Sequence, residues 1–71
     1  MIDIKENFSL GKYNSLQVDH VADYFCEVFN EQDCIEAIDF AKDRKLKSLI
    51  LGEGTNVVFS NDFQGLVIKV N

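Results

Sequence analysis

The sequence predicts a small α/β or α+β fold, a βαβ unit followed by one more strand. A β-favouring segment at 21–29, a helical pattern at 30–45 and an apolar run at 48–51 follow one another along the chain. With 71 residues, no proline and 46% hydrophobic residues, the chain has the size and composition of one small folded domain. We therefore expect a βαβ-β lobe over residues 21–71.

The first twenty residues show no sustained hydrophobic periodicity. They predict an extended arm over residues 1–20, with one short strand at Ser15–Val18. His20 is expected at a turn or strand edge, because no second metal-binding side chain lies at a suitable spacing. Cys26 and Cys34 lack a CxxC spacing and are expected to be two free, buried thiols.

Residues 21–29 are expected to form a strand whose two faces are both at least partly covered. One face would carry Tyr24, Cys26 and Val28, and the other Phe25, Glu27 and Phe29.

The next segment is expected to form a helix that begins after Asn30 and ends near Lys45. Asn30 is a favourable N-cap, and Asp33 completes an approximate capping box. The residues expected on the inner face of this helix are Cys34, Ile35, Ala37, Ile38, Phe40 and Ala41.

The apolar run ends in a loop that carries two glycines, a hydroxyl and an amide. Gly52 and Gly54 permit positive φ and close approach of a ligand, while Thr55 and Asn56 add hydrogen-bonding side chains. Successive amides in such a turn can bind an anion such as a diphosphate. On composition alone, a tight connection after a buried strand is the favoured interpretation of this loop.

Two common nucleotide loops do not fit this spacing. A Walker loop requires Lys and then Ser or Thr directly after its second glycine, where this chain has Thr55 and Asn56. The dinucleotide fingerprint requires glycine at position 57, which is Val57.

The loop resembles the flavin-diphosphate loop of UDP-N-acetylenolpyruvoylglucosamine reductases, which are similar to the wider vanillyl-alcohol-oxidase-like flavoproteins. The family pattern is Gly-(Gly/Glu)-Gly-(Ser/Thr)-Asn followed by aliphatic residues, and residues 52–58 match it. The segments 10–16, 19–22 and 62–68 match in the family's order, so the resemblance covers about residues 8–70. Ser15 and Leu16 depart from it, since they replace the usual Thr and Phe.

The resemblance implies an FAD site and the fold of the first subdomain of the family's FAD-binding domain. The main chain of residues 52–56 would hold the FAD diphosphate; the implied site residues are Leu51, Gly52, Glu53, Gly54, Thr55, Asn56 and Val57. The family enzyme passes a hydride from NADPH through FAD to an enolpyruvyl sugar nucleotide in peptidoglycan synthesis. Its catalytic Ser, Arg and Glu lie in a second lobe and a substrate domain that have no counterpart in these 71 residues. We therefore expect the isolated chain to be catalytically inactive.

Charge and composition bear on partners and location. A net charge of −5 argues against nucleic-acid binding. Six Phe and two Tyr suggest aromatic surface that covers the family's second lobe or a second copy of the chain. The alternatives to the FAD-binding lobe are therefore a self-associating, non-enzymatic remnant and a stand-alone, weak nucleotide-binding module.

Without a signal peptide or a long apolar run, we expect a cytoplasmic protein that does not enter a membrane.

Overall fold

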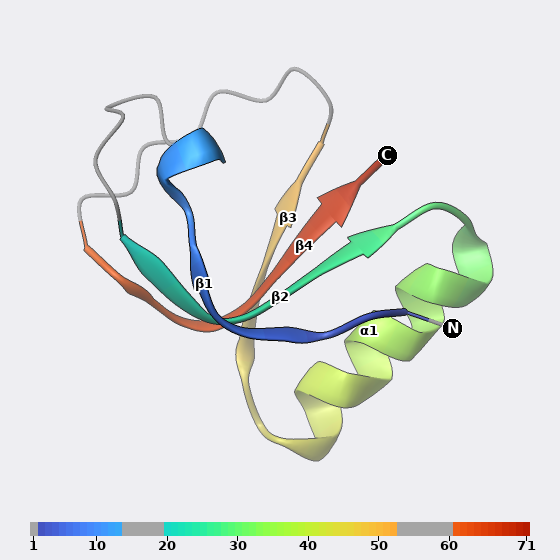
Figure 1. The fold of residues 1–71 in the computed structure, drawn as a ribbon. Helices are drawn as coiled ribbons and strands as arrows, with labels where there is room; N and C mark the ends of the chain where they lie inside the picture. Colours follow the sequence, from blue (N-terminus) through green and yellow to red (C-terminus); the bar gives the residue numbers. More distant parts are fainter. Residues whose placement is uncertain (1, 14–19, 53–60) are drawn as a thin grey trace.

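The strands of the protein form a twisted sheet with a helix on one side (Figure 1). In this computed structural model the described residues are 2–13, 20–52 and 61–71. Their elements, in chain order, are strand β1 (Lys5–Ser9), the 3-10 helix η1 (Gly11–Tyr13), strand β2 (Val21–Val28), helix α1 (Glu31–Asp43), strand β3 (Lys47–Leu51) and strand β4 (Phe63–Val70). The expectation of a small fold that mixes one helix with a sheet is confirmed.

The four strands of the described sheet are arranged in the order β1-β2-β4-β3. Strand β2 runs parallel to β4, β4 runs parallel to β3, and β1 runs antiparallel to β2. The expected βαβ unit is present, but β4 lies between its two strands and becomes the centre of the parallel part. Strand β1 was not predicted, because its sequence shows no apolar alternation; in the structure only Phe8 among its residues is half-buried, and the others are exposed.

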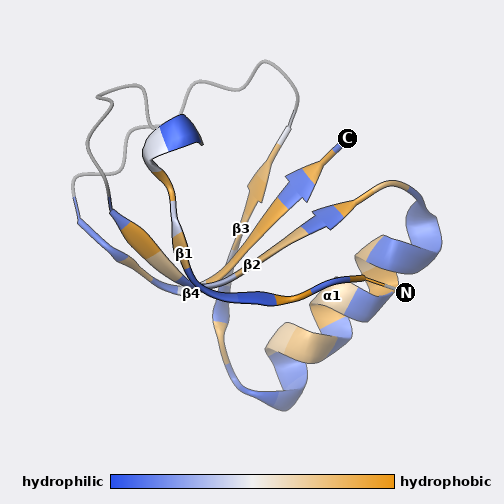
Figure 2. Ribbon diagram, viewed as in Figure 1, coloured by the Kyte–Doolittle hydropathy of each residue, from blue (hydrophilic) through white to orange (hydrophobic). Residues whose placement is uncertain are grey.

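Both faces of the sheet carry an apolar cluster, and Figure 2 shows hydrophobic residues along β2, β3 and β4. The buried members on the helix side are Cys26, Val28, Ala37, Ala41, Leu66 and Ile68. The buried members on the opposite side are Leu10, Ala22, Phe25, Leu51 and Val67. The prediction that residues 21–29 would be covered on both faces is therefore confirmed.

The first two strands change face part-way along their length. Ile4, directly before β1, packs against the helix-side cluster and Phe8 on β1 packs against the opposite one, although a regular extended chain would place both on the same face. Asn7, between them, has a φ of 49°, which interrupts the alternation. The pairing of β2 with β4 shifts register between Ala22 and Tyr24, and these two residues likewise belong to opposite clusters.

Helix α1 begins where the sequence predicted. The side chain of Asn30 accepts a hydrogen bond of 2.8 Å from the main-chain N–H of Asp33, as an N-cap does. The Asp33 carboxylate accepts the N–H of Phe29 at 3.0 Å, whereas a standard capping box would use the N–H of the cap itself. The helix ends at Asp43, slightly before the predicted end near Lys45.

The predicted inner face of α1 is only partly correct. Ala37 and Ala41 are buried, but Ile35 and Ile38 are 47% and 43% exposed, which contradicts their assignment. The buried stripe follows positions 33, 37 and 41, and each helical residue turns by about 100°. Ile38 is therefore rotated about 100° from Ala37, which places it on the flank of the helix, where it is partly exposed. Among the described residues, no helix has the length and apolar character that crossing a membrane requires.

Candidate functional site

The predicted FAD loop leaves the sheet at the end of β3. Leu51 is the last residue of that strand and is 3% exposed, and Gly52 follows it in a half-buried position. The other predicted site residues, Glu53, Gly54, Thr55, Asn56 and Val57, lie outside the described residues, as does the strand predicted at Ser15–Val18. The described part of the site is thus its entry point and the sheet around it.

Leu51 lies at the carboxyl edge of the parallel strands. It pairs with Lys69 on β4, and Lys69 pairs in turn with Glu27 on β2. Because residues in register on neighbouring parallel strands share a face, these three side chains form one row on the side opposite α1. Open α/β sheets bind their ligands at this edge, so Leu51 and Gly52 occupy the position that the prediction requires.

Asn71 connects the polar groups of this edge by hydrogen bonds. Its main-chain N–H donates to the carbonyl oxygen of Val28 at 3.0 Å, and its side-chain Nδ2 donates to Glu27 Oε2 at 2.8 Å. Lys69 Nζ donates to Asn71 Oδ1 at 3.3 Å and to the carbonyl oxygen of Val70 at 3.1 Å. The carboxylate and the ammonium group therefore share one amide as their hydrogen-bond partner.

Lys69 and Asn71 were not identified as site residues from the sequence. Both occur in or beside a segment that reads as a plain terminal strand, and neither belongs to a recognised motif. Their place beside Leu51 depends on the parallel pairing of β4 with β3. The only signal in the sequence is a charged residue in an otherwise apolar strand.

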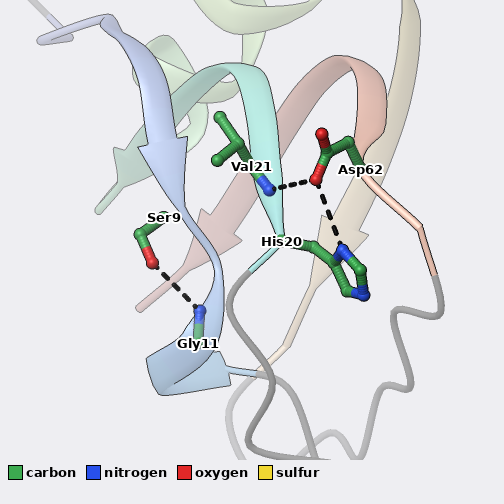
Figure 3. Close-up of polar contacts among 5 residues, drawn as sticks. All are labelled: Ser9, Gly11, His20, Val21 and Asp62. Carbon is green, nitrogen blue, oxygen red and sulfur yellow. Dashed lines mark hydrogen bonds and ion pairs between the residues drawn. The ribbon is translucent and has the colours of Figure 1, made fainter.

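A second polar cluster lies at the opposite edge of the sheet, where β2 and β4 begin (Figure 3). Asp62 Oδ1 accepts the main-chain N–H of Val21 at 2.8 Å and lies 3.3 Å from Nδ1 of His20. The carbonyl oxygen of His20 accepts the N–H of Leu10 at 2.7 Å. His20 is therefore at the edge of a strand, as predicted, and the cluster ties together the start of β2, the start of β4 and the end of the β1 segment.

The two cysteines are free thiols in the helix-side cluster. Cys26 is buried as expected, whereas Cys34 is only half-buried. Burial raises the pKa of the Cys26 thiol to about 11, with smaller contributions from Cys34 and the Asp33 carboxylate. Cys26 is therefore a neutral, unreactive thiol at neutral pH. Among the described residues no group of His, Cys, Asp and Glu side chains is arranged to hold a metal ion.

One cavity of about 320 Å³ lies near the carboxyl end of β2. Its lining residues are Asp3, Lys5, Phe25, Glu27, Phe29 and Asp33. Three carboxylates face one ammonium group there, and that group already contacts Asp3 at 3.4 Å. This charge balance repels a diphosphate, so the cavity does not compete with the β3 edge as an anion site.

Comparison with known proteins finds similar proteins that are UDP-N-acetylenolpyruvoylglucosamine reductases. No family model matches the chain. A UDP-N-acetylenolpyruvoylglucosamine reductase of Escherichia coli (strain K12) is 39% identical over 62 residues, which are 87% of this chain and 18% of the reductase. The reductase of Ralstonia nicotianae is 37% identical over 62 residues, with the same coverage of both proteins. That of Vibrio vulnificus is 33% identical over 67 residues, or 94% of this chain and 19% of the reductase. The chain thus spans about a fifth of the length of these curated relatives.

Proposed function

From the similarity of this chain to one segment of the UDP-N-acetylenolpyruvoylglucosamine reductases, we propose that it is the FAD-binding segment of such an enzyme. Its sheet and helix would then correspond to the first subdomain of a vanillyl-alcohol-oxidase-like FAD-binding domain. The observation that carries the proposal is the position of Leu51 and Gly52 at the carboxyl edge of parallel strands.

The residues of the chain would bind and orient the cofactor. Main-chain amides of residues 52–56 would donate to the diphosphate, with the Thr55 hydroxyl and the Asn56 amide adding hydrogen bonds. The side chain of Glu53 would point away, because a carboxylate beside a diphosphate is repelled. Leu51 and Val57 would form apolar walls, and the burial of Leu51 at the end of β3 fits this role.

FAD, when bound, supplies the hydride-carrying chemistry by which the reductase reaction uses NADPH to reduce its enolpyruvyl substrate. We propose that these 71 residues alone do not catalyse the reductase reaction, since the family's catalytic Ser, Arg and Glu have no counterpart in them. Oxidation of NADPH by the isolated chain in the presence of UDP-N-acetylglucosamine enolpyruvate would contradict this part of the proposal. We also propose a cytoplasmic location, because the soluble cofactors of this reaction are found there.

A flavin fluorescence titration tests FAD binding directly. We expect weak, saturable binding to the wild-type chain and none to Gly54→Val, because a β-branched side chain disfavours positive φ and blocks close approach. Ser48→Val is the matched control, since Ser48 is exposed on β3 and valine suits a strand. Equal affinity of the wild type and Gly54→Val would remove the loop from the site.

Self-association is a second candidate function, favoured by exposed apolar side chains. Phe29 is 66% exposed and Ile50 is 60% exposed, and Ile35 and Ile38 also lie at the surface. Phe29 is the one exposed aromatic residue among those whose burial is described, so this surface is more aliphatic than the sequence suggested. Light scattering over a range of concentrations decides the matter: a dimer is expected, and a monomer at every concentration would contradict it.

A further inference from the structure

Two exposed isoleucines lie close together on helix α1. Ile35 and Ile38 are 47% and 43% exposed, whereas Ala37 and Ala41 are buried. Because each helical residue turns by about 100°, Ile38 and Ile35 point about 100° and 160° away from Ala37, in the same rotational sense. Both therefore lie on one flank of the helix, where nearly half of each side chain is open to solvent.

The charged residues at the two ends of this flank have opposite signs. Glu31 lies four residues before Ile35, and Lys42 lies four residues after Ile38. Their directions, about 120° and 140° from Ala37, fall between those of the two isoleucines. Both side chains are exposed, and neither has an ion-pair partner among the described contacts. We call Glu31, Ile35, Ile38 and Lys42 the α1 stripe.

The spacing of the α1 stripe is that of a coiled-coil seam. Its members are separated by four, three and four residues, the alternation that keeps the core positions of a heptad repeat on one line. A stripe with this spacing packs against a second helix. Its order is acidic, apolar, apolar and basic, which is its own complement when the direction is reversed. A second helix of the same sequence, running antiparallel, therefore fits it.

Antiparallel pairing gives every residue of the α1 stripe a suitable partner on a second copy. Ile35 of one copy faces Ile38 of the other, and Glu31 faces Lys42, because the members of each pair lie equally far from the middle of the stripe. Two-fold symmetry repeats both contacts, so two apolar layers have an ion pair at each end. A parallel arrangement would bring like charges together at both ends. The charges therefore favour a second copy in one orientation.

We propose that the α1 stripe is a dimerisation surface, on which α1 of a second copy of this chain packs antiparallel. This inference rests on self-association, the second candidate function, and assigns it to one surface. Each copy contributes two isoleucines to a single helix-helix contact, so the interface is small. We expect a weak dimer, with a dissociation constant of about 0.1–1 mM.

The first test removes the apolar contacts of the stripe. Ile38→Gln keeps a residue that favours helices but loses the side chain that faces Ile35 in both apolar layers. We expect dimerisation to weaken about tenfold or more. Phe29→Gln is the matched control, since Phe29 is 66% exposed but lies outside α1, and it should dimerise as the wild type does. Sedimentation velocity over concentrations that span the expected dissociation constant measures association, and circular dichroism reports folding.

The second test reverses the charges of the stripe. Glu31→Lys makes both ends of the stripe positive, and Lys42→Glu makes both ends negative. Each variant alone then has two like-charge contacts in the antiparallel dimer, and it should associate about fivefold more weakly than the wild type. An equimolar mixture of the two variants restores opposite charges at both ends. The mixture should therefore recover the affinity of the wild type.

The outcomes separate the inference from self-association itself. If the wild type is a monomer at every concentration, self-association fails and the inference fails with it. If the wild type dimerises but Ile38→Gln weakens the dimer no more than Phe29→Gln does, the surface is wrong and self-association stands. Antiparallel pairing is contradicted if the two charge variants match the wild type, or if their mixture associates no better than either alone. Should Ile38→Gln fail to fold, the charge variants decide.

Discussion

Gly65 on β4 lies against the main chain of Lys47 on β3, with no room for a side chain between them. A Cβ at position 65 would overlap the Lys47 carbonyl oxygen and lie 3.0 Å from the ring of Phe63. The two residues pair at the start of β3, so the absence of a side chain at position 65 allows the strands to meet there. Glycine is required at this place by packing within the sheet.

Gly65→Ala should therefore destabilise the fold. The added methyl group meets main-chain atoms that can move only if β3 and β4 separate, so we expect a loss of about 1–3 kcal/mol in the free energy of unfolding. Urea denaturation followed by circular dichroism measures it. Gln64→Ala, at the exposed neighbouring position, is the control and should change stability little. Equal stability of both variants would show that the strands are not packed this closely.

Removing the N-cap of α1 should also weaken the fold. Asn30→Ala deletes the acceptor for the N–H of Asp33, and we expect a cost of about 1 kcal/mol. Gln32→Ala, on the exposed side of the same turn, should be nearly neutral. A loss of stability in Gln32→Ala as large as in Asn30→Ala would argue against a specific capping role.

The Asp62 cluster predicts unequal effects of its two contacts. Asp62→Ala leaves the N–H of Val21 without its acceptor and should cost about 1 kcal/mol. The contact with His20 involves a carboxylate side chain that is 65% exposed, so the coupling between His20→Ala and Asp62→Ala should be below about 0.5 kcal/mol.

A double-mutant cycle in urea measures this coupling, with Asn61→Ala as the exposed neighbouring control. A coupling above 1 kcal/mol would mean that the pair with His20, rather than the bond to Val21, holds this edge together.

The buried thiol of Cys26 predicts a loss of stability in alkaline solution. Its pKa is raised from 9.0 to about 11, so folding favours the neutral thiol. This contribution is fully present below pH 9 and is lost as the pH rises through 11, by at most about 2–3 kcal/mol.

Unfolding free energies of the wild type and Cys26→Ala at pH 8 and pH 11 check this. Alanine has no group that ionises, so the decrease between the two pH values should be smaller in the variant. Equal decreases would show that other groups, such as lysine and tyrosine, account for the alkaline effect.

The sequence was sufficient for features that depend on neighbours along the chain. Asn30 was identified as a cap because its side chain acts on an amide three residues away, and β2 was identified from its apolar alternation and β-favouring residues. The end of β3 at Leu51 was predicted because glycines interrupt an apolar run there. The assignments of Ile35 and Ile38 were wrong because helical periodicity gives the width of an apolar stripe only approximately, and contact with the sheet decides which part is buried.

By itself, the sequence determined where helix α1 and strand β2 begin, the mixed α and β character of the fold, and the family that the chain resembles, since these depend on local pattern. Only the tertiary structure decided that β4 inserts between β2 and β3, that Lys5–Ser9 adds a strand, and that Lys69 lies beside Leu51. Pairing between strands joins residues far apart in the chain, and the free energy of that pairing depends on how both faces of the whole sheet are covered.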